Sequence, residues 1–366
     1  MTQNVVALTG AGGFLGWHTR AAARESGVLI RTFKTGAGFD PVAASKALHG
    51  SSRLVHIAGV NRGLDSDVED GNLQFASQVA NALRTLEHPP GTIVFANSTQ
   101  VSSGSVYGTA KGAAAKILEK VASEIGADFV DVRLPNLFGE HGKPFYNAVT
   151  ATFSHLLAVG QQPRIDRDRE LCLLHAQDAA DFLLGTVDIA AIDSLSAKRS
   201  VSELLLHLQS ISHFYKKNEI PDISDKFSRD LFNTYRSYTI RSQTPIMIAR
   251  HADERGSFFE IVRARGGSGQ SSFSTTLPGI SRGDHFHRRK VERFTVLSGE
   301  AVISLRRLFD NEVLEFRVTG SSPVAIDMPT MWAHKITNVG SSELYTSFWS
   351  NEIFDPGAPD TIAEAV

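Results

Sequence analysis

A tyrosine and a lysine stand four residues apart in the segment Tyr107-Gly108-Thr109-Ala110-Lys111. On a helix this spacing places both side chains on one face. A neighbouring ammonium group favours the tyrosinate, so we expect Lys111 to lower the pKa of the Tyr107 phenol. Such a phenol can give a proton to a carbonyl oxygen while hydride reaches the carbon, and the hydroxyl of Ser98 or Thr99 can hold the same oxygen. The segment therefore predicts a site that reduces a ketone.

Three histidines and a glutamate form a second group with chemically useful spacing. His285 and His287 point to the same face if they lie on a strand, because side chains alternate there with period two. Glu292 follows after four residues, and His334 stands much further along the chain. Two imidazoles from one strand, a carboxylate from the next and a third imidazole can surround one divalent ion. We expect zinc at this site, although iron, nickel or manganese would also accept these ligands.

A glycine-rich loop follows the first β-branched run of the chain. Gly10, Gly13 and Gly16 have the spacing GxxGxxG, with Phe14 and Leu15 opening an apolar stretch of helical periodicity. Such a loop lets the backbone approach a pyrophosphate, which then lies at the positive end of the following helix. The loop therefore predicts a dinucleotide-binding site.

The end of the second β-branched run indicates which dinucleotide binds. Sites that prefer NAD place an acidic residue there to hold the ribose hydroxyls. Val28–Thr35 contains no acid, but it contains Arg31 and Lys34. Because cations suit a ribose 2′-phosphate, we expect NADPH.

Composition bounds the class of protein. The chain has 366 residues, and its 37 basic and 39 acidic side chains give a formal net charge of -2. This balance argues against a nucleic-acid or anionic-membrane partner, and the length predicts two domains. The single Cys172 excludes an intrachain disulfide and fits a reducing compartment. With no long apolar run and no basic start leading into one, we expect a cytoplasmic protein.

The pattern of residue types changes along the chain. Up to about residue 190, short β-branched runs alternate with alanine-rich stretches, which predicts a parallel sheet covered by helices on both faces. Beyond about residue 244, frequent glycines separate short strands, which is typical of an all-β sandwich or barrel. We therefore predict an α/β Rossmann-type domain over residues 1–243 and an all-β domain over residues 244–366. The expected strands are Val5–Leu8, Val28–Phe33, Leu54–Ala58, Thr92–Ala96, Phe129–Leu134, Phe294–Leu297, Ala301–Leu305 and Pro323–Ile326, and the expected helices include Phe14–Glu25 and Ala110–Ile125.

Further motifs in the first 240 residues resemble those of an extended short-chain dehydrogenase/reductase, of the class that acts on nucleotide sugars. Val55-His56-Ile57-Ala58-Gly59 resembles that family's fourth-strand motif, which implies that Ala58 and Gly59 lie under the cofactor. The resemblance also implies that Asn72 supports the active site and that Lys111 anchors the cofactor ribose. Within Arg133–Gly139 it assigns Asn136 to the substrate. Arg169 is the nearest counterpart of the arginine that contacts the substrate diphosphate.

The second half resembles the cupin fold, a double-stranded β-helix. The histidine and glutamate spacing described above matches both cupin motifs, except that Met331 replaces the usual glycine. Asp253–Glu260 resembles a stretch of the cupin-class sugar-nucleotide 3,5-epimerases, in which Arg255 and Glu260 would bind substrate. The acid and the base of this domain stay unassigned, and so does the choice between a catalytic and a structural metal.

Across its whole length the chain resembles the bifunctional capsular polysaccharide enzymes known as CapF or WbjC. The resemblance implies that the cupin domain epimerises C3 of a UDP-2-acetamido-2,6-dideoxy-4-hexulose. The reductase domain would then reduce the C4 ketone with NADPH, on the path to UDP-N-acetyl-L-fucosamine. Cupins commonly pair strands between subunits, so the resemblance also implies a homodimer.

Two alternatives remain open on these residues. One is a nucleotide-sugar epimerase or dehydratase that holds and recycles its NAD(P), with a cupin that only dimerises. The other is a sugar-nucleotide sensor without enzymatic activity. Net oxidation of NADPH separates the first from a reductase, and exchange of the C3 hydrogen with solvent argues against the second.

Overall fold

The chain forms two compact units in a computed structural model that describes residues 4–366. Unit 1 takes in the residues up to Phe138 together with Glu170–Arg199, and unit 2 takes in Gly139–Arg169 and Ser200–Val366. The chain therefore passes between the units three times. The division at residues 243 and 244 stays a prediction, because these units are defined by compactness alone.

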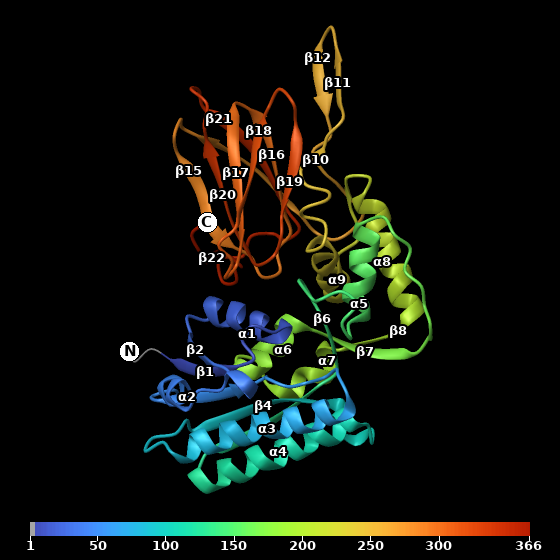
Figure 1. Cartoon of the computed structure of the whole chain (residues 1–366). Helices are drawn as coiled ribbons and strands as arrows, with labels where there is room; N and C mark the ends of the chain where they lie inside the picture. The colour runs from blue at the N-terminus through green and yellow to red at the C-terminus, as the bar shows by residue number, and fades with distance from the viewer. Residues whose placement is uncertain (1–3) are drawn as a thin grey trace. The chain divides into compact units, whose positions relative to one another are not determined.

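Unit 1 is built on a five-stranded parallel sheet with the strand order β2-β1-β3-β4-β5 (Figure 1). The strands are β1 (Val5–Thr9), β2 (Leu29–Phe33), β3 (Arg53–His56), β4 (Thr92–Ser98) and β5 (Asp128–Leu134). Each coincides within a few residues with a β-branched run of the sequence, so these strand predictions are confirmed. The motif that resembles the family's fourth strand begins in β3, the third strand of this chain, and continues beyond its end.

Helices cover both faces of this sheet, because side chains alternate along its strands. Leu54, Ile93 and Phe95 are buried among residues of α2, α3 and α4. Val55 and Val94 are buried on the other face, among residues of α1 and α6. The helices are α1 (Phe14–Glu25), α2 (Pro41–Leu48), α3 (Asp65–Arg84), α4 (Val106–Ile125) and α6 (Ala176–Leu184). The arrangement confirms the expected Rossmann-type layers.

Short elements complete unit 1. A three-stranded sheet joins β6 (Asn136–Phe138), β7 (Glu170–His175) and β8 (Ala197–Ser200). Single turns of helix occur at η1 (Gly36–Gly38), η2 (Thr99–Ser102), η3 (Ile189–Ala191) and α7 (Ile192–Leu195). Of these, η2 matters most for function, because it connects the end of β4 to α4.

Unit 2 contains three helices and most of the β structure. The helices are α5 (Val149–Ala158), α8 (Val201–Tyr215) and α9 (Lys226–Arg236). At the start of α8, the Ser200 hydroxyl accepts from the Glu203 N–H and the Glu203 carboxylate accepts from the Ser200 N–H, which is a capping box. Helices α8 and α9 thus make up much of residues 200–240.

Two five-stranded antiparallel sheets form the β part of unit 2, in the orders β10-β19-β16-β21-β14 and β18-β17-β20-β15-β22. Residues from both sheets share one buried core that includes Phe294, Ile303, Ile326 and Ile336. The expected all-β fold is confirmed. The strands are β10 (Ile246–Met247), β14 (Gln270–Thr276), β15 (Ser281–Phe286), β16 (Glu292–Ser298), β17 (Glu300–Arg307), β18 (Val313–Thr319), β19 (Val324–Met328), β20 (Trp332–Asn338), β21 (Leu344–Ser350) and β22 (Ile362–Ala363).

Two smaller β elements lie outside these sheets. The hairpin of β11 (Arg250–Asp253) and β12 (Gly256–Phe259) is a sheet of its own and extends away from the larger sheets of unit 2 (Figure 1). A short parallel pair joins β9 (Glu219–Ile220) to β13 (Arg263–Ala264).

A buried ion pair ties the helices of unit 2 to its strands. The Arg293 guanidinium on β16, which has no exposed side-chain surface, donates to both oxygens of Asp327 on β19 at 2.6 and 2.9 Å. Its third nitrogen donates to the carbonyl and side-chain oxygens of Asn218, and the Tyr215 hydroxyl at the end of α8 donates to Asp327. Burial by itself would raise the pKa of Asp327, but the charge of Arg293 holds that pKa below its usual value.

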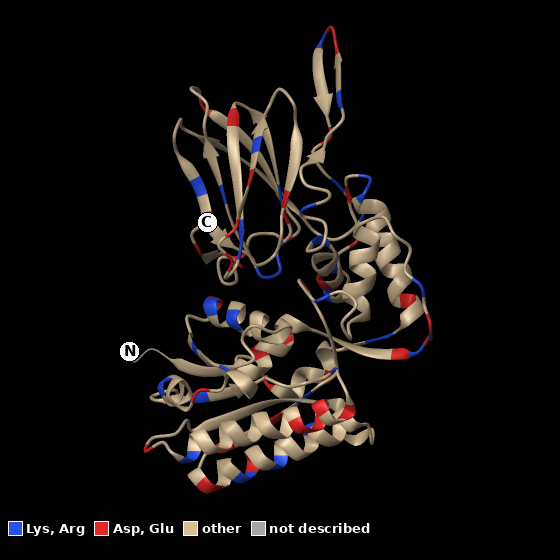
Figure 2. Ribbon diagram, viewed as in Figure 1, with Lys and Arg blue, Asp and Glu red and all other residues tan. Residues whose placement is uncertain are grey.

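Charged residues are mixed over the chain. Basic and acidic positions are interspersed along α4, whereas the acidic positions of α3 lie near its start and Arg84 lies at its end, and both kinds occur in unit 2 (Figure 2). Among residues 4–366, no helix is at once long enough and apolar enough to cross a membrane.

Replacing Arg293 tests how much the buried ion pair contributes to the stability of unit 2. Arg293→Met leaves the Asp327 carboxylate buried without its partner, so we expect the free energy of unfolding of unit 2 to fall by about 3–5 kcal/mol. Urea denaturation followed by tryptophan fluorescence measures the change. Arg241→Met is the matched control, because Arg241 pairs with Glu312 at the surface and such pairs contribute about 0–1 kcal/mol. Equal losses in the two variants would contradict the prediction.

Candidate functional site

The glycine loop between β1 and α1 brings the backbone unusually close to the end of β3. Gly10 has φ +72°, and a Cβ there would lie 2.7 Å from the Ala58 nitrogen. A Cβ on Gly16 would overlap the Gly10 carbonyl oxygen. Such a cradle leaves room for a phosphate against the backbone, at the start of α1 where Gly13 precedes Phe14 and Leu15. These residues fit a dinucleotide.

Thr9, the last residue of β1, connects the start of the glycine loop to the end of the neighbouring strand β3. The Thr9 hydroxyl lies 2.7 Å from Nδ1 of His56, and it accepts from the N–H groups of Ile57 and Ala58 at 3.2 and 3.3 Å. Burial, together with the charge of Lys111, lowers the pKa of His56 to about 3, so this imidazole is neutral. Thr9 therefore fixes the position of the Ala58–Gly59 backbone.

Gly59, Asn72 and Lys111 converge at the end of β3. The Asn72 amide donates to the carbonyls of Val60 and Val68, each at 2.7 Å. A Cβ on Gly59 would lie 2.8 Å from Oδ1 of Asn72 and 3.8 Å from Nζ of Lys111. Three residues predicted separately are thus brought together, with the glycine leaving the space between them open.

Tyr107 and Lys111 lie on the first turns of α4, which confirms the predicted helix. The Ser105 hydroxyl caps it by accepting from the Gly108 N–H at 3.1 Å. Lys111 is buried, and its ammonium nitrogen donates to the Ala96 carbonyl at 2.6 Å and lies 4.0 Å from the centre of the Phe95 ring. Tyr107 is half-buried. The lysine is therefore held by β4, the strand that carries Ser98.

The expected direction of the Tyr107 pKa is wrong in this structure. Burial raises the pKa of the Tyr107 phenol, and no lowering by Lys111 accompanies it. Burial also lowers the pKa of Lys111 to about 7, although the nearby Asp131 carboxylate acts in the opposite direction. A lysine that loses part of its charge cannot exert the full effect that the sequence spacing suggested.

Ser98 and Thr99 occupy different environments. Ser98 ends β4 half-buried, and its hydroxyl accepts from the Gln100 N–H at 3.2 Å. Thr99 opens η2 and is exposed. The Asn97 side chain accepts from the Ser98 N–H and donates to Asp131 at 2.7 Å, which fixes this end of the strand.

The other site residues predicted in unit 1 make their contacts with residues outside this cluster. Arg31 lies within β2 and donates to the His49 carbonyl at 2.7 Å, whereas Lys34 follows the end of β2 and folds over Gly38. Asn136 is exposed on β6, and its amide donates to the Cys172 carbonyl at 3.2 Å. The roles of these residues stay predictions.

The four predicted metal ligands come together in unit 2. One ligand atom from each of His285, His287, Glu292 and His334 lies within 4.8 Å of the others. The Glu292 carboxylate is 2.9 Å from Nε2 of His287 and 3.7 Å from Nε2 of His334. His285 and His287 flank the end of β15, while Glu292 opens β16 and His334 lies on β20. The set combines imidazole and carboxylate donors, as a zinc or other transition-metal site does.

Backbone carbonyls orient two of these imidazoles toward the cluster. Nδ1 of His287 donates to the Asp360 carbonyl at 2.5 Å, and Nδ1 of His334 donates to the Trp332 carbonyl at 3.2 Å. Each ring therefore keeps Nε2 for the centre, and Nε2 of His334 is buried with no hydrogen-bond partner. An orphaned imidazole nitrogen facing a carboxylate and two further imidazoles fits a metal ion.

Burial sets the charges in the cluster. It lowers the pKa of His334 to about 3, assisted by the neighbouring His287 and His285, and it also lowers the pKa of His285. Burial would raise the pKa of Glu292, but its hydrogen bond with His287 and the charges of His287 and His334 lower that pKa to about 2. Burial thus favours the neutral forms of His285 and His334, and an imidazole binds metal in its neutral form, as a carboxylate does in its ionised form.

The three charged residues predicted to bind substrate make separate contacts and do not contact one another. These residues are Arg169, Arg255 and Glu260. Arg169 is exposed just before β7. Arg255 lies at the tip of the β11–β12 hairpin with a side chain 90% exposed, and it pairs with Asp253 at 2.6 Å. Glu260 pairs with Arg263 at 2.8 Å. Their assignment to substrate stays a prediction.

Several residues with clear roles were missed from the sequence. Gly108 gave a usable signal, because a glycine next to the tyrosine permits close approach of α4 to the Gln100 carbonyl, which a Cβ would overlap. Thr9, Asp131 and Asp360 gave none, since each acts through a contact with residues far away in the chain.

Comparison with known proteins matches both halves of the chain. The NAD dependent epimerase/dehydratase family matches residues 6–190, which is about half of the chain. A Polysaccharide biosynthesis C-terminal domain matches residues 251–362. The UDP-2-acetamido-2,6-beta-L-arabino-hexul-4-ose reductase of Pseudomonas aeruginosa is 29% identical over 372 residues, covering 99% of this chain and 98% of that protein.

Solved structures agree with this assignment. The capsular polysaccharide assembling protein CapF from Staphylococcus aureus is 30% identical with a TM-score of 0.61, covering 99% of this chain and 100% of its own. The UDP-glucose 4-epimerase from Thermotoga maritima covers 65% of this chain and 99% of its own, with 16% identity and a TM-score of 0.53, which shows a shared fold only. The chain therefore belongs to the NAD dependent epimerase/dehydratase family in its first half and, over its whole length, to the family of the capsular polysaccharide assembling protein CapF.

Proposed function

We propose that the protein is a bifunctional nucleotide-sugar enzyme of capsule or O-antigen synthesis. The cupin domain predicted over residues 244–366 epimerises C3 of a UDP-2-acetamido-2,6-dideoxy-4-hexulose. The reductase domain predicted over residues 1–243 reduces the C4 ketone with NADPH, toward UDP-N-acetyl-L-fucosamine. One observation carries the proposal: a single chain holds a tyrosine and a lysine beside a glycine-lined loop, and also three imidazoles and a carboxylate around a common centre. The relative from Pseudomonas aeruginosa, whose name describes a 4-ketose reductase, supports the same reading.

The reductive site rests on three side chains of unit 1. When bound, the nicotinamide supplies hydride to the carbonyl carbon. Tyr107 gives its phenolic proton to the carbonyl oxygen, and the hydroxyl of Ser98 or Thr99 holds that oxygen. Burial keeps the phenol protonated and ready to donate. Lys111, held between the Ala96 carbonyl and the Phe95 ring, anchors the ribose and supplies positive charge as the tyrosinate forms.

The epimerase site uses the acidity that a C4 ketone gives to the hydrogen on C3. Removal of that proton forms an enolate, which needs stabilisation at oxygen. His285, His287, Glu292 and His334 would hold a divalent ion, with zinc our expectation, and the ion would supply Lewis acidity or structural support. Arg255 and Glu260 are our candidates for substrate contacts in this site, whereas Arg169 is our candidate for the diphosphate contact of the reductase site. The base and the acid stay unassigned.

A cupin-mediated homodimer in the cytoplasm completes the proposal. β14 is an edge strand of its sheet, and Phe273 on it is 65% exposed. An open edge with an apolar side chain suits strand pairing between subunits. The mass of the protein in solution, measured by light scattering, tests this part.

Incubation with the 4-keto substrate in deuterated water, with and without NADPH, tests the whole proposal. We expect deuterium at C3 in both mixtures and stoichiometric loss of NADPH absorbance in the second. An epimerase or dehydratase that recycles a tightly held cofactor gives no net loss of NADPH. A sensor gives neither signal.

Tyr107→Phe removes the proton donor without changing the shape of the ring. We expect NADPH-dependent ketone reduction to fall by about 10²–10⁴-fold, because a positioned acid contributes that much to proton transfer. Deuterium uptake at C3 should persist, since it belongs to unit 2. Tyr345→Phe is the matched control, because the exposed Tyr345 hydroxyl donates to Glu343. Undiminished reduction by Tyr107→Phe would contradict the assignment.

Gly16→Ala tests the cofactor cradle. The added Cβ would overlap the Gly10 carbonyl, so we expect NADPH binding, measured by fluorescence titration, to weaken at least about tenfold through displacement of the loop. Gly112→Ala is the same change in a helix, but its Cβ would meet nothing within 4 Å and should leave binding unchanged. The same titration with NADH tests the preference expected from Arg31 and Lys34.

His287→Ala tests the metal centre. Loss of one imidazole should abolish bound zinc, measured by mass spectrometry of the purified protein, and with it the uptake of deuterium at C3. His213→Ala is the control, because His213 is exposed on α8. Full exchange at C3 in a chelated, metal-free protein would exclude a metal-dependent epimerase.

A further inference from the structure

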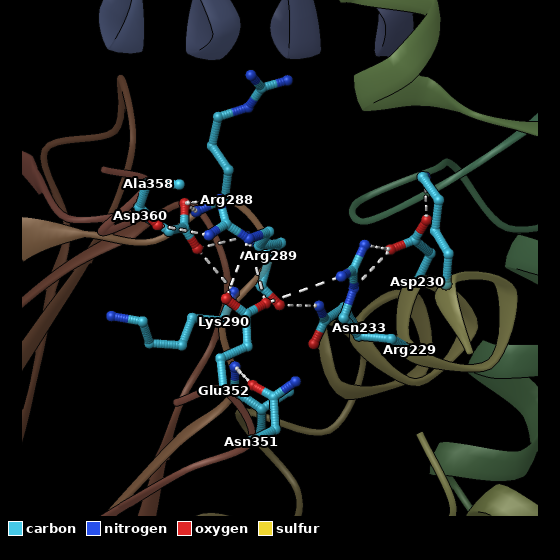
Figure 3. A network of polar contacts seen from close by, with 12 residues as sticks. Arg229, Asp230, Asn233, Arg288, Arg289, Lys290, Asn351, Glu352, Ala358 and Asp360 are labelled. Carbon is cyan, nitrogen blue, oxygen red and sulfur yellow. Dashed lines mark hydrogen bonds and ion pairs between the residues drawn. The ribbon is translucent and has the colours of Figure 1, made fainter. Parts of the chain in front are cut away.

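One carboxylate holds the loop that follows the second metal-site histidine. Both oxygens of Asp360 are buried, and they accept from the backbone N–H groups of Arg288, Arg289 and Lys290 at 2.9, 2.9 and 2.8 Å (Figure 3). Three consecutive N–H donors directed at one carboxylate fix the backbone of these residues. The loop therefore has the conformation that Asp360 imposes.

The same residue also holds the histidine itself. The Asp360 carbonyl accepts from Nδ1 of His287, which leaves Nε2 of that ring for the centre. Asp360 has φ +45°, a left-handed conformation that is uncommon for residues other than glycine, although aspartate and asparagine adopt it more often than most. The surroundings must therefore hold it in place, and its buried side chain supplies three of those contacts.

Residues that follow Asp360 contact the first histidine. β22 pairs with β15 so that Ala363 lies opposite His285 and Ile362 opposite Phe286. The Glu364 N–H donates to the Asp284 carbonyl at 3.0 Å. One short segment of chain thus contacts the backbone around both histidines of the His-Phe-His motif.

The far side of the loop is held independently. The Arg289 guanidinium donates to the Glu352 carboxylate, and the Asn233 amide on α9 donates to the Arg289 carbonyl at 2.9 Å (Figure 3). The Asn351 side chain accepts from the Val291 N–H at 2.8 Å, just before Glu292. Because these contacts anchor the loop without touching His287, removal of the Asp360 carboxylate should loosen one histidine rather than unfold the region.

We propose that Asp360 is a positioning residue for the metal centre, acting through the orientation of His287 and the backbone of residues 288–290. The proposal rests on the metal centre proposed above. A freely rotating imidazole must give up its freedom when it binds metal, whereas a ring held by the Asp360 carbonyl is already oriented.

Zinc release and ligand geometry test this role. Asp360→Asn keeps a residue that tolerates positive φ, but it replaces one acceptor oxygen by an NH2 group that faces N–H donors. We expect zinc to bind about 10–100-fold more weakly than in the wild-type protein, and to pass to a chelator correspondingly faster, which is the range seen when groups that orient a metal ligand are disturbed. In the cobalt-substituted protein the visible bands should shift, which a change in stability alone would not cause.

Two further variants complete the test. Asp360→Gly suits the positive φ, keeps the carbonyl and removes both acceptor oxygens, so it should release zinc faster still. Asp355→Asn is the matched control in the same segment, because the carboxylate of the exposed Asp355 accepts from the Gly357 N–H and not from residues 288–290, so this variant should behave as wild type. Hydrogen exchange in the metal-free proteins should show faster exchange at residues 288–290 in the two Asp360 variants.

Three results would overturn the inference or its basis. Wild-type release rates and cobalt spectra in both Asp360 variants would leave Asp360 with a structural role only. Equal effects of Asp355→Asn would show that the segment acts nonspecifically. A wild-type protein that takes up no zinc or cobalt would instead remove the proposed metal centre, and the positioning role with it.

Discussion

The arrangement of unit 2 depends on the burial of a single guanidinium. Arg293 has no exposed side-chain surface, and an unpaired charge there would be strongly destabilising. Its hydrogen bonds are met from β19 through Asp327 and from the turn after α8 through Asn218. The helix and the two strands therefore cannot shift independently. This explains why residues 200–243 form one compact unit with the β sheets that follow them.

The same strand extends this constraint to the proposed metal centre. Glu292 immediately precedes Arg293 on β16, so their side chains point to opposite faces of the sheet. In the register with β19, Glu292 lies opposite Met328 and Arg293 lies opposite Asp327. The ion pair on one face of the sheet thereby fixes the position of Glu292 along β16. On the other face, this position places the Glu292 carboxylate beside His287 and His334. Arg293, which forms the buried ion pair, and Glu292, a proposed metal ligand, are therefore neighbours in the sequence but lie on opposite faces of the sheet.

The sequence was informative wherever a function depends on local spacing. The period-two placement of His285 and His287, the four-residue spacing of Tyr107 and Lys111, and the glycine loop all correspond to features found in the structure. The strands and helices around them were predicted for the same reason, since β-branched runs and helical periodicity are local signals. These signals identify the helices and strands and their order along the chain. They also show which candidate site residues lie on, or next to, each helix or strand.

Sequence could not supply the contacts between distant residues or the degree of burial. Asp360 reaches His287 across 73 positions, and no spacing rule connects them. The pKa of Tyr107 was given the wrong direction because the prediction used the charge of Lys111 and ignored how deeply both groups are buried. Burial is a property of the packed chain, so it becomes visible only when the strands and helices are in place.

Under the proposed function, the C4 ketone links the two chemistries in a fixed order. The ketone makes the C3 hydrogen acidic, and enolisation in unit 2 is reversible, so epimerisation alone yields a mixture of two configurations. Proton transfer from Tyr107 accompanies conversion of the ketone to an alcohol, and the C3 hydrogen then loses its acidity. Reduction must therefore follow epimerisation, and it fixes whichever configuration the site around Tyr107 and Ser98 accepts. On this proposal, the C3 configuration of the product is decided at the reductase site, although C3 is inverted at the epimerase site.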